Sequence, residues 1–187
     1  PQCKQDLEQY CEKGMNLTYN DKDMVDGSIN FGGYATNIVV NEDFVLHVPK
    51  EFKEKDLAGV APLLCAGITT YSPLRHWKVG KGSKVAVVGL GGLGHMAIKL
   101  AKGLGADVTL FSRTISKEKD AFELGADAVV MSTDASQMKS VKGKFDLIID
   151  TVPYVHDVNP YVATLRISGT LVLVGYLGGL EPVLNSV

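Results

Sequence analysis

The residues Gly89-Leu90-Gly91-Gly92-Leu93-Gly94 carry glycines at the spacing G-x-G-x-x-G, directly after a short apolar run and directly before a helical segment. In that context the first glycine permits a tight turn, the second lets the backbone approach an anion without a Cβ in the way, and the third lets a helix pack closely on a strand. Free N–H groups at the helix N-terminus attract the same anion. The motif predicts a site for the pyrophosphate of a dinucleotide; a glycine-rich turn needed only for packing is the alternative.

Polar residues after the next apolar run indicate which dinucleotide such a site prefers. About 20 residues past the glycines, folds that bind NAD place an acidic residue that accepts hydrogen bonds from the ribose hydroxyls. Here Ser112 and Arg113 follow the run, and Lys117 comes one turn later. A hydroxyl and two cations suit a 2′-phosphate, so these residues predict NADP. A solvated basic loop is the alternative, because Glu118 and Asp120 lie close by.

Three cysteines, Cys3, Cys11 and Cys65, are the side chains that could ligate a soft metal. An odd number in a chain without an export signal disfavours a disulfide framework, so metal ligation or burial must explain them. A cysteine on an apolar segment, like Cys65, is usually a small core residue. The thiols of Cys3 and Cys11 cannot alone complete the tetrahedral site of a structural zinc.

The elements that must position these residues alternate regularly from Lys84 onward. We expect strands at 84–89, 107–112, 126–131, 145–150 and 170–175, and helices at 91–105, 116–125 and, with a weaker pattern, 136–141. Strands separated by crossover-length helices form a parallel sheet, and runs that are apolar throughout fit strands buried on both faces. The expected fold class is therefore α/β, with a Rossmann-type doubly wound parallel sheet. Before Pro49, strand-like segments at 34–40 and 44–48 predict a β-rich region.

Composition excludes several classes of partner. The chain has 187 residues, of which 45% are hydrophobic and 21% charged, and its 19 basic and 21 acidic residues give a formal charge of -2. That balance provides no basic surface for nucleic acid or for a membrane. No apolar run approaches the roughly 20 residues of a membrane-spanning helix. The first residues are polar, so we expect a cytoplasmic protein; the missing initial methionine suggests a piece of a longer polypeptide.

Several segments together resemble the zinc-dependent medium-chain alcohol dehydrogenases, and within them the NADP-linked branch that is similar to cinnamyl alcohol dehydrogenase. They are the C-x7-C of Cys3 and Cys11, Tyr10-Cys11 followed by LTYN, Gly32-Gly33-Tyr34, APLLCAGITTYSPLRHW and VAVVGLGGLGHMAIKLAKGLGA. The resemblance covers essentially the whole chain. It implies hydride transfer between NADP(H) and a primary alcohol or aldehyde, in which zinc acts as a Lewis acid.

The resemblance also implies two zinc sites in the full-length protein. Cys65 would be a ligand of the catalytic zinc, whose other cysteine and histidine ligands belong to a preceding part of the protein. Cys3 and Cys11 would be the last two of four thiolates on a structural zinc, whose first two lie upstream of Pro1.

Further positions follow from the same resemblance. Thr69 would lie beside the nicotinamide, and Thr151, Val174 and Gly175 would line its ring from the carboxyl ends of the fourth and fifth strands. Residues 1–48 would be the remnant of a β-rich, GroES-like catalytic domain with the structural-zinc lobe. Residues 49–187 would hold linking helices and an NADP-binding Rossmann domain that is incomplete at its C-terminus.

Two other functions stay open beside this one: a dinucleotide-binding module without catalysis, and an NAD-linked zinc alcohol or polyol dehydrogenase. We expect the full-length protein to be a homodimer that acts on a small-molecule aldehyde or alcohol. Members of the family usually pair a sixth strand across a two-fold axis, and Leu180–Val187 ends before such a strand could finish. Residues 1–187 alone are therefore expected to be inactive and, through the open edge of strand 170–175, to self-associate.

Overall fold

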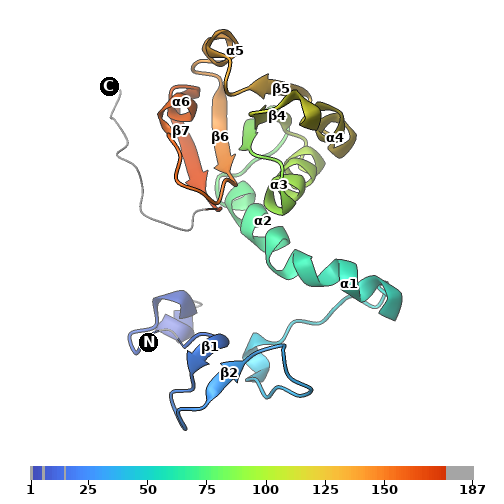
Figure 1. Ribbon diagram of the computed structural model, residues 1–187, viewed down its shortest axis with the longest axis vertical. Helices are drawn as coiled ribbons and strands as arrows, with labels where there is room; N and C mark the ends of the chain where they lie inside the picture. The colour runs from blue at the N-terminus through green and yellow to red at the C-terminus, as the bar shows by residue number, and fades with distance from the viewer. Residues whose placement is uncertain (1, 6, 15, 176–187) are drawn as a thin grey trace. The chain divides into compact units, whose positions relative to one another are not determined.

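The computed structural model describes residues 2–5, 7–14 and 16–175 (Figure 1). The chain divides into two compact units, Pro1–Glu51 and Phe52–Val187. The segment Leu180–Val187, on which the expected sixth strand depends, lies outside the described residues. Within them, no single helix is long and apolar enough to cross a membrane; the bent pair Glu54–Leu64 and Ala66–His76 passes that test by length and composition alone.

The first unit holds a small antiparallel hairpin of β1 (Tyr19–Lys22) and β2 (Ile29–Phe31). Three short 3₁₀ helices accompany it: η1 (Gln2–Gln5), η2 (Glu8–Tyr10) and η3 (Glu42–Phe44). The hydroxyl oxygen of Tyr19 accepts a hydrogen bond from the Gly33 N–H at 3.1 Å. Its ring lies so close to Gly32 that a Cβ on that glycine would be 2.6 Å from it. The glycine pair therefore lets the chain turn tightly over the Tyr19 ring.

The strands expected at 34–40 and 44–48 were wrong. Residues 34–40 are irregular, and the 3₁₀ helix Glu42–Phe44 ends at the residue where the second strand was expected to start. A strand needs a neighbour for its backbone N–H and C=O groups, and in the described part of this unit no segment pairs with either one. Val39 and Leu46 are accordingly 98% and 77% exposed.

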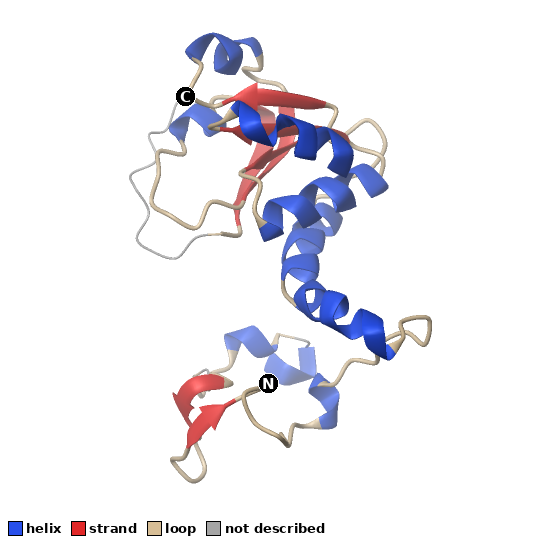
Figure 2. Ribbon diagram, turned by 45° about the vertical axis from the view of Figure 1, so that its right-hand side comes forward, coloured by secondary structure: helices blue, strands red, loops and turns tan. Residues whose placement is uncertain are grey.

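The second unit begins with a run of helices and continues into a parallel sheet (Figures 1 and 2). The leading helices are η4 (Glu54–Asp56), α1 (Leu57–Val60), η5 (Ala61–Leu64) and α2 (Ala66–His76). The strands are β3 (Lys84–Val88), β4 (Asp107–Ser112), β5 (Ala128–Met131), β6 (Phe145–Asp150) and β7 (Leu165–Leu173). They pair in parallel in the order β5-β4-β3-β6-β7. This is the strand order of the Rossmann fold, as the sequence predicted.

Helices cover both faces of this sheet. Successive residues of a strand point to opposite faces, and because these strands are apolar throughout, both faces must be covered. The connecting helices are α3 (Gly92–Gly103), α4 (Glu118–Leu124, preceded by η6, Ile115–Lys117), α5 (Ala135–Ser140) and α6 (Asn159–Val162). Val85 and Val87 of β3 pack in one core with residues of α2, α3 and α4. Ala86 and Val88 pack in the other with Met138 of α5 and Tyr161 of α6. The sheet is therefore doubly wound.

The fifth strand of the sheet, β7, differs from the expected 170–175. It begins at Leu165, and its pairing with β6 shifts register between Phe145 and Leu147. At the shift Ser168 has φ 65°, and a Cβ on Gly169 would lie 2.7 Å from the Phe145 carbonyl oxygen. The chain therefore forms a β-bulge at Ser168 and Gly169, where the glycine lets the backbone of β7 approach that of β6 closely. The strand continues through these two residues, although a serine followed by a glycine is typical of a turn.

Candidate functional site

A cavity of about 450 Å³ lies at the carboxyl ends of β3, β4 and β6. The strand order reverses between β3 and β6, and ligands of open α/β sheets bind at such a point. Three groups of residues line the cavity: Val88–Gly91 after β3; Phe111–Thr114 with Lys117 after β4; and Thr151–His156 after β6, together with Ser132 and Tyr161. The structure therefore brings Gly89, Gly91, Arg113 and Lys117 to one place.

The glycines of the loop between β3 and α3 occupy three different environments. Gly89 has φ +86°, a conformation that side chains with a Cβ rarely adopt. A Cβ on Gly94 would lie 2.1 Å from the Gly89 carbonyl oxygen, so the third glycine lets α3 begin against the end of β3. A Cβ on Gly91 would meet nothing within 4 Å. Packing thus requires glycine at Gly94, whereas at Gly91 the space beside the backbone is open to a ligand.

The turn after β4 is held by the hydroxyl of Ser112. This side chain, 7% exposed, donates to the Thr114 carbonyl oxygen at 2.8 Å and accepts from the Thr114 N–H at 3.2 Å. Its hydroxyl is therefore engaged in the turn that presents Arg113. Across residues 2–5, 7–14 and 16–175, the ion pairs involve neither Arg113 nor Lys117. Both cations are free to bind an anion.

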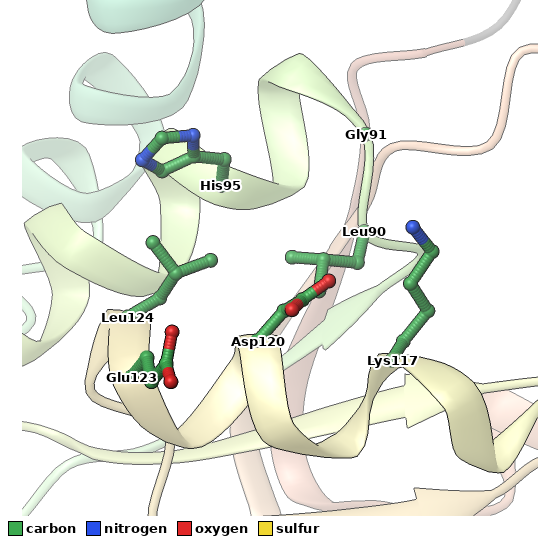
Figure 3. A pocket seen from close by; sticks show the side chains of 7 residues that line it. All are labelled: Leu90, Gly91, His95, Lys117, Asp120, Glu123 and Leu124. Atoms are coloured by element: carbon green, nitrogen blue, oxygen red, sulfur yellow. The ribbon is translucent and has the colours of Figure 1, made fainter.

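Lys117 also lines a second cavity of about 340 Å³, between the first turn of α3 and α4. Figure 3 shows its side chain extending from the end of η6, just before α4, toward the loop of Leu90 and Gly91. Asp120 and Glu123 lie further along α4 on the same cavity. Lys117 therefore lines both cavities, whereas Asp120 and Glu123 line the second cavity and not the first.

Thr151, Val174 and Gly175 lie together where β6 and β7 end. The Thr151 hydroxyl donates to the Val88 carbonyl oxygen at 2.7 Å and so ties the end of β6 to that of β3. A Cβ on Gly175 would lie 2.4 Å from the Thr151 carbonyl oxygen, and the Val174 N–H donates to the Asp150 carbonyl oxygen at 2.9 Å. Of these three residues Thr151 lines the 450 Å³ cavity, while Val174 and Gly175 do not, nor do Gly92, Leu93 and Gly94.

Asp150, His156 and Tyr161 also line or adjoin this cavity and were not predicted from the sequence. The Asp150 carboxylate is 1% exposed and lies 2.8 Å from Nε2 of His156. Burial raises the pKa of Tyr161, so its phenol stays protonated and neutral. A signal was available: Asp150 ends a strand next to the point where the strand order reverses, and His156 follows within the same loop.

Metal ligation by the cysteines depends on more donors than the described residues bring together. Cys3, Cys11 and Cys65 are exposed, free thiols. Cys65 separates η5 from α2, where its carbonyl oxygen accepts from the Thr69 N–H at 2.9 Å, and Thr69 is half-buried in the first turn of α2. Among the residues that the structure describes, no group of three or more His, Cys, Asp or Glu could hold a metal ion. They do not by themselves form a zinc site.

Comparison with known proteins gives a consistent family. Residues 92–186 match the model of the zinc-binding dehydrogenase family. A "probable formaldehyde dehydrogenase" of Bacillus subtilis is 50% identical over 173 residues, 92% of this chain and 48% of that protein. An "NADP-dependent alcohol dehydrogenase C 1" of Mycolicibacterium smegmatis is 51% identical over 174 residues, 92% of this chain and 49% of that protein. The chain thus spans about half the length of these relatives.

Solved structures give the same match. A cinnamyl alcohol dehydrogenase of Sorghum bicolor superposes with a TM-score of 0.88 at 43% identity, over 97% of this chain and 51% of that one. A Helicobacter pylori protein described as CAD, complexed with NADP(H), superposes with a TM-score of 0.81 at 43% identity, over 94% of this chain and 48% of that one.

Proposed function

This chain belongs to the zinc-binding dehydrogenase family, and we propose that it is the nucleotide-binding part of a zinc-dependent alcohol dehydrogenase that transfers hydride between NADP(H) and a primary alcohol or aldehyde. The cavity that places Gly91 beside Arg113 and Lys117 is the observation that carries this proposal. Relatives named NADP-dependent alcohol dehydrogenase and aldehyde reductase support the reaction class.

The loop after β3 binds the pyrophosphate in this proposal. Gly91 leaves the space beside its backbone open. Gly92 begins α3, whose N-terminal N–H groups and dipole favour an anion. These groups act alike on NAD and NADP, so the choice between the two dinucleotides must come from another part of the site.

Arg113 and Lys117 supply that choice by binding the 2′-phosphate of NADP. Both line the cavity and neither pairs with a carboxylate in the described part of the chain. The last position of β4 carries Ser112, whose hydroxyl closes the turn, and no acid is present there to accept from ribose hydroxyls. A cation beside a phosphate forms a charge-assisted hydrogen bond, which NADH cannot offer.

At the other end of the dinucleotide, Thr151, Val174 and Gly175 line the nicotinamide. The Thr151 hydroxyl fixes the ends of β6 and β3 relative to each other, and Gly175 lets the chain after β7 pass directly over the Thr151 backbone. Thr69 approaches the same ring from the first turn of α2. These residues orient the ring for hydride transfer and exclude water from it.

Cys65 is one ligand of the catalytic zinc, and Cys3 and Cys11 are two of the four ligands of a structural zinc. The remaining ligands come from parts of the full-length protein outside this sequence. Residues 1–48 then belong to the catalytic domain, and 49–187 to the linking helices and the nucleotide-binding domain.

The protein is a cytoplasmic homodimer in this proposal. Three free, exposed thiols suit a reducing compartment. Among residues 2–5, 7–14 and 16–175, strand β7 lies at an edge of the five-stranded sheet, with β6 as its partner. Its other side offers N–H and C=O groups to a further strand, and an extended sheet can continue across a two-fold axis.

The test compares dissociation constants of NADPH and NADH for the full-length protein and its Arg113→Ala variant. One charge-assisted contact contributes about 1.5 to 3 kcal/mol, so the variant should bind NADPH about tenfold or more weakly while NADH binding changes little. Lys99→Ala, which removes an exposed cation of α3 away from the cavity, is the matched control. Equal losses for both dinucleotides, or a preference of the unmodified protein for NADH, would refute the assignment.

A further inference from the structure

The imidazole of His156 faces two hydrogen-bond acceptors. Its Nε2 lies 2.8 Å from Oδ2 of Asp150, and its Nδ1 lies 2.8 Å from the carbonyl oxygen of Tyr154. A carbonyl oxygen accepts and cannot donate, and the same holds for an ionised carboxylate. Both contacts are therefore hydrogen bonds at once when the ring carries two protons, as an imidazolium.

The partner carboxylate is buried and needs a positive charge nearby. Asp150 is 1% exposed; its Oδ1 accepts from the Val152 N–H at 3.0 Å, and its Oδ2 faces His156. A buried carboxylate is stable only when it is paired and hydrogen-bonded. The imidazolium meets both requirements, because it brings a charge and a donor to the Oδ2 oxygen.

These contacts hold one wall of the cavity. Residues 151–153 and 155–158 have no regular secondary structure, and residues 151–156 all line the cavity of about 450 Å³. Tyr154 and Val155 are 73% and 53% exposed, so burial contributes little to their position. The His156 side chain connects the loop to the end of β6 through Asp150 and to its own backbone through Tyr154. Loss of either hydrogen bond would let the wall move.

The other charged and titratable groups near the His156 ring do not supply the positive charge and the hydrogen-bond donor that Asp150 receives from the imidazolium. Tyr161 of α6 packs its ring 6.0 Å from the His156 ring, edge to face, and burial keeps its phenol neutral. Arg113 and Lys117 line the same cavity from the segment that follows β4, and no ion pair or hydrogen bond joins either of them to His156 or Asp150 among the described residues. Asp157, the next residue along the loop, accepts from the backbone and side-chain N–H groups of Asn159.

We propose that protonated His156, held by Asp150, is a positioning residue that fixes the 152–156 loop as the wall of the nucleotide cleft and makes dinucleotide binding depend on pH. The proposal rests on the proposed function, in that the cavity must bind a dinucleotide. When the imidazolium loses a proton, one ring nitrogen presents a lone pair to the Tyr154 carbonyl or to the Asp150 carboxylate. That contact becomes repulsive and the wall loosens. Binding is therefore tighter at low pH, where the ring is charged, and weaker at high pH.

The test measures the dissociation constants of NADH and NADPH for the full-length protein between about pH 5.5 and 8.5, the range in which histidine changes charge. NADH is the primary probe, because the 2′-phosphate of NADPH titrates itself near a pKa of about 6. For NADH we expect a dissociation constant about three- to tenfold larger at the upper end of the range, the effect of losing one hydrogen bond.

Asp150→Asn separates positioning from general structural damage. An amide at residue 150 can still accept from the Val152 N–H, and its NH₂ group can donate to Nε2 of a neutral His156, whose Nδ1–H donates to Tyr154. Both contacts then persist without the extra proton, so the pH dependence of NADH binding should flatten. His156→Ala should weaken binding at every pH, and the exposed His76 of α2 provides the control His76→Gln, which should keep the original profile.

The outcomes are distinguishable. If the unmodified protein binds both dinucleotides, but its NADH affinity depends on pH in the same way as that of Asp150→Asn, the role of His156 is overturned. The proposed function then stays intact. A protein that binds neither dinucleotide at any pH would overturn the proposed function, and the role of His156 with it. Nitrogen chemical shifts of His156 give a check independent of binding: a neutral ring at the pH where NADH binds most tightly would also refute the proposal.

Discussion

The carbonyl oxygen of Gly89 occupies the space that a Cβ on Gly94 would need: the two atoms would be 2.1 Å apart. The first glycine of the loop is therefore in direct van der Waals contact with the third. Gly89 can take this position because its φ of +86° turns the chain sharply after β3. As a result, α3 begins against the end of β3, next to the loop residues Gly89 to Gly91 that line the cavity.

Gly94→Ala should therefore destabilise the fold. Added atoms in a packed region cost about 1 to 3 kcal/mol when the surrounding backbone must move, which for a chain of this size lowers Tm by several degrees. Thermal unfolding followed by circular dichroism measures the effect. Gly103→Ala is the control, because a Cβ on this last residue of α3 would meet nothing within 4 Å. Equal Tm values for the two variants would contradict the packing argument.

Gly91→Ala should weaken dinucleotide binding and leave the stability of the fold nearly unchanged, unlike Gly94→Ala. Its Cβ would meet nothing within 4 Å and its φ of −108° suits any residue, so stability should change by less than about 1 kcal/mol. The methyl group would instead fill the space where the pyrophosphate approaches the backbone. We expect NADPH and NADH affinities to fall about tenfold or more, and to similar extents, in a calorimetric titration. Unchanged affinity would show that the phosphates bind elsewhere.

The sequence predicted the sheet well because its strands are short, apolar throughout and separated by glycines that end helices. Gly125, for example, ends α4 with φ +106°. It failed at 34–40 and 44–48: these segments have the residue pattern of strands, but no other segment among the described residues pairs with them. The alternation of apolar residues indicates which side chains could be buried. Strand formation also depends on a neighbouring segment whose backbone can pair with it, and the alternation does not reveal that segment.

The sequence predicted that the glycine loop and the basic turn lie near each other, because each directly follows a strand of the parallel sheet, and the structure places both on one cavity. Asp150 and His156 could not be recognised in this way. Asp150 is the last residue of β6 and His156 lies six positions later in an irregular loop, and they interact because the chain folds back toward the end of the strand. The role of Ser112 was also not visible, since its hydroxyl is taken by the Thr114 carbonyl and N–H in a local turn.

Cys65→Ser in the full-length protein should abolish turnover and leave dinucleotide affinity within a few-fold. The thiol is exposed at the start of α2, and Cys65 does not line the cavity that holds Gly91 and Arg113. Metal analysis should find about one zinc fewer per subunit, because serine is a poor replacement for a thiolate ligand. A variant that keeps its zinc and its activity would show that Cys65 is not a ligand.

Asp127→Asn should reduce stability in a way that depends on pH. Asp127 joins three elements: its Oδ1 accepts from Lys102 at the end of α3 at 2.5 Å, and its Oδ2 accepts from the Val108 N–H at 2.7 Å, just before β5 begins. The hydrogen bond from Lys102, reinforced by that from Val108, lowers the pKa of Asp127. A lowered pKa in the folded state means that the ionised carboxylate stabilises the fold above the unfolded pKa of about 4, and that this contribution is lost as the pH falls through the folded value.

The size of this effect is limited by solvent, because both side chains of the ion pair are 42% exposed. We therefore expect a loss of only about 1 kcal/mol in the free energy of unfolding at pH 7, measured by urea denaturation. The difference from the unmodified protein should shrink as the pH is lowered toward about 3, since protonation removes from Asp127 the same charge that the substitution removes. Asp107→Asn, an exposed carboxylate at the start of β4, is the control and should show neither the loss nor its pH dependence. If the loss in the free energy of unfolding stays constant from pH 7 to about 3, the charge on Asp127 contributes nothing to the junction of α3, β4 and β5. The side chain would then act by its shape and packing alone.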